Sequence, residues 1–391
     1  MSRICNSLFQ IFAILLISLT IQFAWGSNLV LVSSNLGNRL SVYNGSSFKN
    51  AFLVPGIMFA AQDKISENVY TITLNTENDT YLFSAYDKDF LKTGDYTKRI
   101  YSVNLGYDRV KDLLANKNML YIITTRSIVT ITRKEDERKQ VFFSKTISYV
   151  EPTLENTIIS AAVVPPHNIA ILKAQNLNNG YSKLKFDIYA EDDANKLLHL
   201  DSIYTFNIKT GDVFRSKVVV NKPDAKFLYI LMPNQILVFH GQPGNDEISW
   251  SGYYHTPTEI DVGFDHDPLK GAGNFVDMLS VSSLGNVNNS FVYLYSDSPH
   301  NSEVSIYCIG PENEYILSPI GSGIVFSNSG YLPGLWLGLD RDVATIYTSS
   351  NQTSTMLHNT INLFSGRFDF PVFIENKGNT VGYYPRIYVS Y

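Results

Sequence analysis

The sequence predicts an all-β fold, a β-propeller of four-stranded blades, and three observations support that class. Tyr and Phe number 25 and 23, and aromatic residues make up 13% of the chain, which suits the half-buried surfaces of pleated sheets. Short apolar runs recur in pairs joined by a polar turn. No run longer than about 12 residues has a clear helical period, apart from a short candidate helix at 108–115.

The paired runs form a repeat along the whole chain. In one clear example, the run 118–125 turns at Arg126 into the run 127–132. Seven such units start about 50 residues apart, which is the length that a four-stranded blade needs. The units span residues 29–45, 67–88, 118–134, 167–192, 226–241, 289–310 and 341–366.

Further β-rich runs between these units supply the first and fourth strands of each blade. The total predicts seven blades, with six as the alternative. Residues 29–32 and 386–391 also have strand patterns, so we expect the two terminal strands to pair in one sheet and close the ring. Candidate first strands are 157–164, 275–281 and 323–327, and candidate fourth strands are 140–144, 248–254 and 371–374.

A tandem of immunoglobulin-like sandwiches would give strands of similar length. Such domains usually carry a Cys pair and a buried Trp each. This chain has 2 Cys, Cys5 and Cys308, and 3 Trp, so it lacks that framework and the propeller is favoured. Cys308 lies in an apolar run and is expected to be a buried thiol, with an intermolecular disulfide as the alternative.

The first 27 residues predict a signal peptide. Arg3 precedes an apolar run from Leu8 to Ile21, and Ala24-Trp25-Gly26 then gives the small-x-small pattern that precedes a cleavage site, here before Ser27. The predicted organisation is therefore a signal peptide at 1–27 and a single propeller domain at 28–391, secreted and free of the membrane after cleavage. The alternative is a retained type II signal anchor, with the rest of the chain on the lumenal or cell-surface side.

Four N-glycosylation sequons gain meaning from this secretory leader. They fall between apolar runs, where a glycan can be accommodated, and we expect some of them to be occupied. Their acceptor residues are Asn44, Asn78, Asn288 and Asn351.

Charge argues against nucleic acid as a partner. The net charge is −5, and no stripe of Lys and Arg interleaved with aromatic residues occurs. We therefore expect no positive field that would attract a phosphate backbone.

One acidic loop, within residues 256–275, is the densest candidate for ligand or cation binding. Its carboxylate oxygens could hold a hard cation such as calcium, although the spacing matches no EF-hand loop and a solvated acidic loop is the alternative. No other cofactor is predicted, and no nucleophile elbow, phosphate loop or zinc motif identifies catalytic residues. The candidate residues of the loop are Asp261, Asp265, His266 and Asp267.

These observations predict a secreted glycoprotein that binds an extracellular protein or glycan through the loops of one propeller face. Two alternatives stay open: a calcium-dependent hydrolase or lactonase with the cation in its channel, and a structural coat or viral surface protein.

Overall fold

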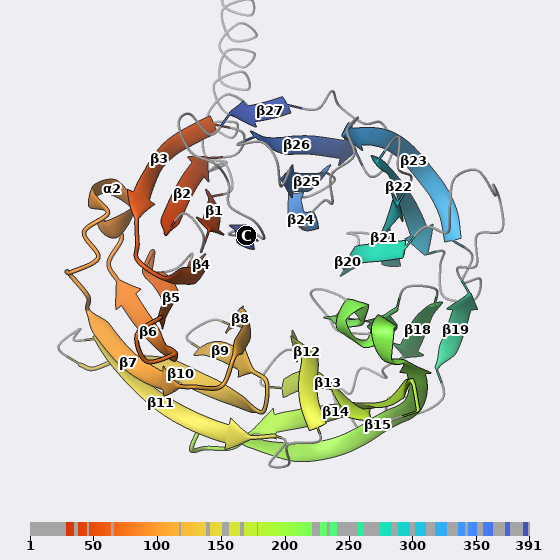
Figure 1. Ribbon diagram of the computed structural model, residues 1–391, viewed down its shortest axis with the longest axis horizontal. Coiled ribbons are helices and arrows are strands. Elements are labelled where there is room, and N and C mark those ends of the chain that lie inside the picture. Colours follow the sequence, from red (N-terminus) through yellow and green to blue (C-terminus); the bar gives the residue numbers. More distant parts are fainter. Residues whose placement is uncertain are drawn as a thin grey trace, which may run out of the picture.

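A computed structural model of the chain shows an all-β protein (Figure 1). It describes residues 29–34, 38–44, 47–63, 66–116, 119–137, 141–150, 156–164, 168–177, 179–220, 227–232, 235–240, 257–261, 274–282, 288–297, 302–309, 317–326, 335–340, 343–349, 355–362, 372–375 and 386–389. The predicted signal peptide at 1–27 lies outside these residues. Within them, no helix is long and apolar enough to cross a membrane.

The described strands form antiparallel sheets of four strands each, which we label A to G. Sheet A contains β28 (Arg386–Val389), β1 (Leu29–Ser34), β2 (Arg39–Asn44) and β3 (Ser47–Leu53). Sheet B contains β4 (Ile57–Gln62), β5 (Val69–Asn75), β6 (Thr80–Tyr86) and β7 (Tyr101–Gly106), and sheet C contains β8 (Val110–Asn116), β9 (Met119–Thr124), β10 (Ser127–Glu135) and β11 (Val141–Tyr149). Sheet D contains β12 (Asn156–Val164), β13 (Asn168–Asn176), β14 (Tyr181–Glu191) and β15 (Leu197–Lys209).

The three remaining sheets also contain four strands each. Sheet E contains β16 (Lys217–Val220), β17 (Phe227–Leu231), β18 (Gln235–His240) and β19 (Thr258–Asp261), and sheet F contains β20 (Asn274–Ser282), β21 (Asn288–Asp297), β22 (Ser302–Ile309) and β23 (Leu317–Phe326). Sheet G contains β24 (Leu335–Asp340), β25 (Val343–Ser349), β26 (Thr355–Asn362) and β27 (Val372–Glu375). Among the described connections, α2 (Phe90–Thr93) and η1 (Thr210–Arg215) are short helices.

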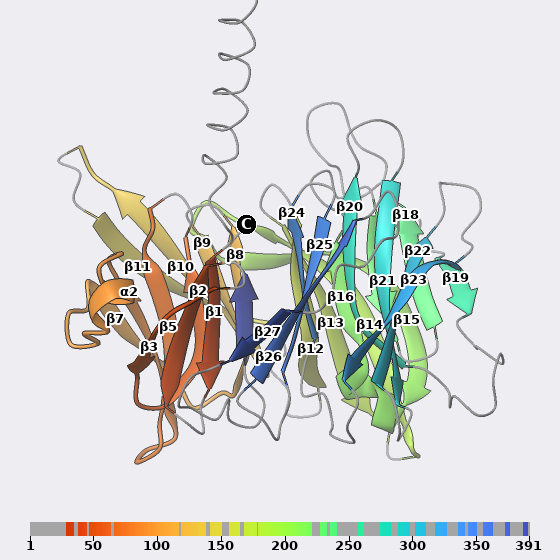
Figure 2. The same cartoon turned by 90° about the horizontal axis from the view of Figure 1, so that it is seen from above.

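The sheets follow one another in chain order around a common centre, as Figure 1 and the view from above in Figure 2 show. One edge strand of each sheet lies nearest to this centre, and the opposite edge strand lies on the outside. The inner strands contact one another from sheet to sheet, in the order β28, β4, β8, β12, β16, β20, β24 and again β28. This arrangement is propeller-like, and the all-β prediction is confirmed.

The paired runs predicted from the sequence all form antiparallel hairpins. They are β1–β2, β5–β6, β9–β10, β13–β14, β17–β18, β21–β22 and β25–β26, the central strands of sheets A to G. The last described strand joins the first sheet, since β28 pairs with β1 through Val30 opposite Val389.

Two details of the predicted strands are wrong. The candidate helix at 108–115 is β8 for most of its length, because its backbone pairs with β9, and tertiary pairing outweighs local helix propensity. The run 323–327 was expected to begin a sheet, but β23 ends sheet F at Phe326 and β24 begins sheet G. The predicted fourth strand at 248–254 lies outside the described residues.

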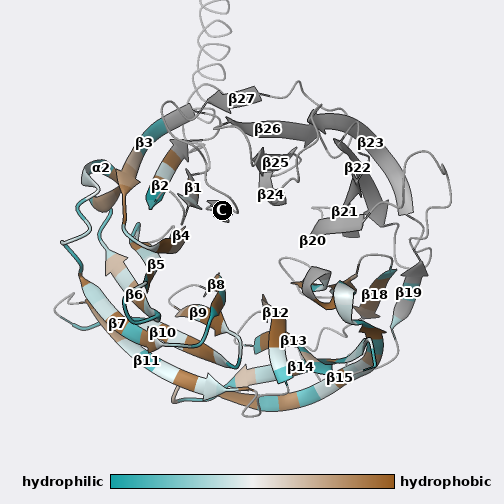
Figure 3. Ribbon diagram, in the orientation of Figure 1, coloured by the Kyte–Doolittle hydropathy of each residue, from teal (hydrophilic) through white to brown (hydrophobic). Residues whose placement is uncertain are grey.

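The core consists of buried apolar layers between neighbouring sheets. The described layers lie between sheets A and B, B and C, C and D, and D and E. Strands such as β17 are buried along their whole length, because both faces of a central strand pack against other sheets. Between sheets B and C, for example, Ile72 and Phe83 pack with Ile122 and Ile131. Outer strands such as β15 contain mostly exposed and half-buried residues, with few buried ones, and Figure 3 shows the corresponding mixture of hydrophobic and hydrophilic positions.

Inner strands carry β-bulges near their first residues. The register shifts after Ile57 in β4, Val110 in β8, Ile158 in β12 and Phe275 in β20. A bulge redirects side chains, and in β8 it directs Lys111 toward sheet D, where its Nζ donates a hydrogen bond to the carbonyl of Ile158. Burial lowers the pKa of Lys111 to about 8, and the positive charge of Arg109 adds to this effect.

Candidate functional site

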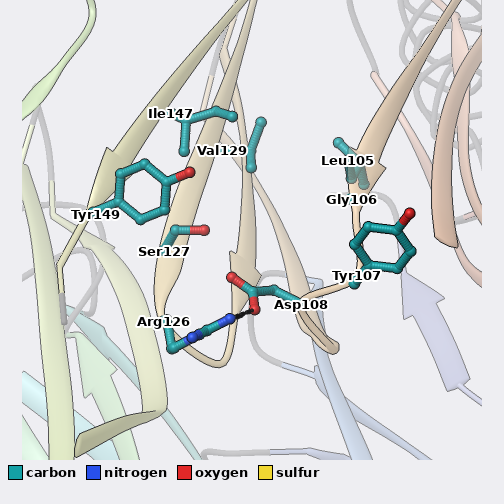
Figure 4. Close-up of a pocket in the computed structure, with 9 residues that line it drawn as sticks. All are labelled: Leu105, Gly106, Tyr107, Asp108, Arg126, Ser127, Val129, Ile147 and Tyr149. Atoms are coloured by element: carbon teal, nitrogen blue, oxygen red, sulfur yellow. Dashed lines mark hydrogen bonds and ion pairs between the residues drawn. The ribbon is translucent and has the colours of Figure 1, made fainter. Parts of the chain in front are cut away.

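A pocket of about 390 Å³ lies between the outer part of sheet B and sheet C (Figure 4). It is found where β7 leads into β8 and where β9 turns into β10. The lining residues are Leu105, Gly106, Tyr107, Asp108, Arg126, Ser127, Val129, Ile147 and Tyr149.

An ion pair between Asp108 and Arg126 forms one end of the pocket. Asp108 Oδ1 accepts hydrogen bonds from Arg126 Nη2 at 2.5 Å and from Arg126 Nε at 3.1 Å. Hydrogen bonding to Asp108 and its negative charge raise the pKa of Arg126. In Figure 4 one carboxylate oxygen faces the guanidinium, and the other is directed toward the pocket.

The strand register of sheet C brings these two residues together. Val110 pairs with Thr124, so Asp108 and Arg126 extend the same antiparallel pair by two positions beyond its end. Thr125 N also donates a hydrogen bond to Arg109 O at 3.1 Å, which continues the pairing into the turn. The ion pair therefore depends on backbone geometry as well as on charge.

Tyrosine side chains stand at the sides of the pocket. Tyr107 is 76% exposed and Tyr149 is 69% exposed. Val129 is buried in the core between sheets B and C, and the half-buried Ile147 packs against it. The pocket thus combines aromatic walls and an apolar floor with one carboxylate and one guanidinium.

A buried hydroxyl pair fixes the turn that carries Arg126. Thr124 Oγ1 accepts hydrogen bonds from Ser127 N at 2.9 Å and from Arg126 N at 3.3 Å. It also donates a hydrogen bond to Ser127 O at 2.9 Å, and it lies 2.9 Å from Ser127 Oγ. Thr124 and Ser127 are both buried, so the turn is held by side-chain hydrogen bonds that water does not replace.

This arrangement could act on a small ring-shaped ligand. Tyrosine rings stack on the apolar face of a sugar ring, and Asp and Arg form hydrogen bonds with hydroxyl or carbonyl oxygens. A carboxylate can also take a proton from water, while a guanidinium stabilises a developing oxyanion.

Of the four candidate residues of the acidic loop, the structure describes only Asp261. Asp261 is the last residue of β19 and pairs with Gln235 in β18. Asp265, His266 and Asp267 lie outside the described residues. Among the residues that are described, no group of three His, Cys, Asp or Glu side chains is placed to hold a metal ion.

The four sequons differ in their surroundings. Asn78 is exposed in the β5–β6 turn, and its Oδ1 accepts a hydrogen bond from Thr80 Oγ1 at 2.6 Å. Asn44 ends β2 and Asn288 begins β21, while Asn351 lies outside the described residues. Cys308 lies in β22, opposite Phe291 and Ser318 in the neighbouring strands.

A second polar cluster is buried in sheet D, away from the pocket. Lys173 Nζ lies 2.5 Å from Asp187 Oδ2 and donates a hydrogen bond to Tyr189 OH at 3.2 Å. His199 Nε2 lies 3.9 Å from Asp187 Oδ1, at the exposed side of the cluster. Because Lys173 and Asp187 are both buried, each compensates the charge of the other.

Comparison with known proteins identifies the fold class. No family model and no curated protein sequence matches the chain. A solved structure of a protein from Lactobacillus plantarum is similar over 92% of this chain and 99% of its own, with 12% identity and a TM-score of 0.59. The periplasmic gluconolactonase PpgL of Pseudomonas aeruginosa is similar over 93% of this chain and 99% of its own, with 11% identity and a TM-score of 0.60.

At these identities the likeness concerns the fold alone. Together with the four-stranded sheets around a common centre, it supports the β-propeller class. One of these fold neighbours, PpgL, is a gluconolactonase.

Sequence reasoning missed the pocket residues. It treated Arg126 as a turn residue and Asp108 as the start of a helix. The signal that could have found them is the strand pairing itself, since reading residues 110–116 as a strand opposite 119–124 places positions 108 and 126 side by side.

Proposed function

We propose that this chain is a secreted, closed, seven-bladed propeller that binds the ring of a sugar lactone in the Asp108–Arg126 pocket and hydrolyses it. The observation that carries the proposal is the carboxylate and guanidinium pair beside a ring-sized pocket with two exposed tyrosines. The fold likeness to a gluconolactonase favours the lactonase alternative over simple glycan binding.

Contacts between the inner strands support closure of the ring. They link each described sheet to the next and reach from β24 in sheet G to β28 in sheet A. Pairing of β28 with β1 joins the last described strand to the first blade, so the terminal strands support one another.

Hydrolysis of a lactone adds one water molecule to the ring. In this pocket the Asp108 carboxylate takes a proton from water, and the water oxygen bonds to the lactone carbonyl carbon. Arg126 stabilises the oxyanion that forms on the carbonyl oxygen. The bond from that carbon to the ring oxygen then breaks, and the ring oxygen takes the proton back from Asp108, giving a hydroxy acid.

Initial rates of acid release from δ-gluconolactone, above the spontaneous rate, test this proposal. Wild-type protein should accelerate the release, and Asp108→Asn should reduce kcat by about 100-fold because the base is lost. Asp79→Asn is a matched control, because Asp79 is an exposed carboxylate in the β5–β6 turn and its φ of 53° suits Asn. Equal rates for wild type and Asp108→Asn would contradict the assignment.

Non-catalytic binding of a glycan is the second candidate. The exposure of Tyr107 and Tyr149 favours it, since exposed aromatic rings on one face are contact surfaces for sugars and proteins. A glycan that binds wild type and loses binding in Tyr107→Ala, without any lactone hydrolysis by wild type, would favour this function.

Glycosylation at Asn78 belongs to the same proposal of a secreted protein. Its position in an exposed turn leaves room for a glycan, and the Asn78 and Thr80 side chains already contact each other. Intact mass of the protein from a eukaryotic secretory host should fall after glycosidase treatment, and Asn78→Gln should remove one glycan. An unchanged mass would contradict occupancy of this sequon.

A further inference from the structure

Sheet D contacts the turn that carries Arg126 through the backbone of Ile158. This residue is buried in β12, at the β-bulge of that strand. Its N–H donates a hydrogen bond to Thr125 O in the β9–β10 turn at 2.8 Å. Its carbonyl oxygen accepts a hydrogen bond from Lys111 Nζ in β8. Both polar backbone groups of Ile158 therefore bond to the segments of sheet C that lead to the pocket.

These two bonds belong to a closed ring of hydrogen bonds. Thr125 N donates a hydrogen bond to Arg109 O at 3.1 Å, and the chain from Arg109 to Lys111 completes the ring. Asp108 directly precedes Arg109, and Arg126 directly follows Thr125. The ring therefore holds together the two segments that carry the ion pair, by contacts that do not involve the charges of the pair.

Two further hydrogen bonds hold the same turn. Thr157 Oγ1 donates to Thr125 O at 3.3 Å, so this carbonyl accepts two hydrogen bonds from sheet D. Val150 N donates to Arg126 O at 3.2 Å, which links the turn to the end of β11. Lys111 supplies the bond in the opposite direction, from sheet C to sheet D, and this bond closes the ring.

Resting on the proposed function, we infer that Lys111 is a positioning residue, which holds Asp108 and Arg126 at hydrogen-bond distance by tethering β8 to Ile158. Lys111 does not line the pocket, so it acts through the pair and not on the ligand. The ion pair is partly exposed and by its charges alone fixes its own geometry weakly, because water screens exposed charges. A displacement of about 1 Å between catalytic groups can lower a rate by up to about 100-fold.

The Nε–H signal of Arg126 reports the geometry of the ion pair without any substrate. Arg126 Nε donates a hydrogen bond to Asp108 Oδ1, which slows exchange of this proton with water. NMR at mildly acidic pH measures the exchange rate, and loss of the signal in Arg126→Gln assigns it. The rate should rise about tenfold in Lys111→Met, because the loss of one hydrogen bond has an effect of about that size.

Two variants accompany this measurement. Lys111→Arg keeps N–H donors at the end of a long side chain and should restore most of the protection. Lys49→Met removes an exposed lysine of β3 and should leave the exchange rate unchanged. Thermal unfolding shows that each variant is folded at the temperature of the measurement.

The division of the kinetic effect between kcat and KM distinguishes positioning from a loss of stability. Lys111→Met should lower kcat for δ-gluconolactone by about tenfold and leave KM within about twofold, because Tyr107 and Tyr149 still contact the ring. If Lys111→Met does not fold, Thr157→Val provides a second test. It removes one bond from sheet D to Thr125 and should cause smaller changes in the same direction.

The outcomes separate this inference from the proposed function. An Arg126 Nε–H exchange rate that is the same in wild type and Lys111→Met would overturn the inference, whether or not wild type hydrolyses the lactone. An equal rise in Lys49→Met would also overturn it. Faster exchange in Lys111→Met, with no lactone hydrolysis by wild type, would support the tether and contradict the proposed function.

Discussion

Asp108 Oδ1 accepts hydrogen bonds from two nitrogens of Arg126, at 2.5 and 3.1 Å, although the residues are 18 positions apart. The pair lies just beyond the last paired residues of β8 and β9, Val110 and Thr124. Its geometry is a direct consequence of strand register, and it gives the pocket both a base and a cation.

Replacement of Arg126 tests the role of the guanidinium in lactone hydrolysis. Arg126→Gln should lower kcat/KM for δ-gluconolactone by about 100-fold, because the oxyanion loses a charged donor. Stability should change by less than about 1 kcal/mol, because the pair is partly exposed. Arg109→Ala, which removes an exposed arginine outside the pocket lining, is the control for kinetics and unfolding. An equal loss of kcat/KM in Arg126→Gln and Arg109→Ala would contradict a specific role of Arg126. It would show that removal of any positive charge near the pocket has the same effect.

Lys111 should make stability depend on pH in the alkaline range. Its pKa is about 8 in the folded protein, below the ordinary value of 10.5. Between these values the folded state has lost the proton and the unfolded state retains it, so stability rises with pH through this window. Complete burial would increase the free energy of unfolding of wild type, relative to Lys111→Met, by about 2 kcal/mol between pH 7.5 and pH 9.5, and because Lys111 is only partly buried we expect about 1 kcal/mol. Urea titrations at both pH values measure it, with Lys49→Met as an exposed control. A constant difference would contradict the lowered pKa.

Removal of one partner of the buried ion pair in sheet D should be costly. Lys173→Met leaves the buried Asp187 carboxylate uncompensated, and the free energy of unfolding should fall by about 3 kcal/mol or more. The double variant Lys173→Met with Asp187→Val should recover most of this loss, because no isolated charge remains. Chemical denaturation of wild type, both single variants and the double variant provides the comparison, and additive losses of the two single variants would argue against coupling.

Gly56 should not tolerate a side chain. Its φ is +67°, and an added Cβ would lie 2.1 Å from the carbonyl oxygen of Leu74. Gly56→Ala should therefore destabilise the protein by about 2 kcal/mol or more through backbone strain and steric conflict. Gly211→Ala is the matched control, because no atom lies within 4 Å of its added Cβ. Equal melting temperatures for the two variants would contradict this account.

Much of the fold follows from the sequence because central propeller strands are buried on both faces. Runs such as 227–232 and 119–123 are continuously apolar, and the polar turn after each marks a hairpin that the structure contains. Outer strands are harder to predict. They are only half buried, and in Val141–Tyr149 most residues remain exposed or partly exposed, so the apolar pattern is weak.

The candidate site could not be derived in the same way. Asp108 and Arg126 are ordinary turn residues in sequence, and a helical pattern at 108–115 concealed the pairing that joins them. Tyr107 follows the end of β7, whereas Tyr149 is the last residue of β11. The acidic loop could be predicted as a candidate because its residues are close in sequence. The pocket residues come from three separate segments of the chain.

A crystal structure of the protein with δ-gluconolactam tests the central claim most directly. We expect the ring of the lactam, which keeps the carbonyl of the lactone and resists hydrolysis, in the pocket between Tyr107 and Tyr149, with its carbonyl oxygen within hydrogen-bond distance of Arg126. A lactam bound at any other place on the molecule, with this pocket empty, would contradict it.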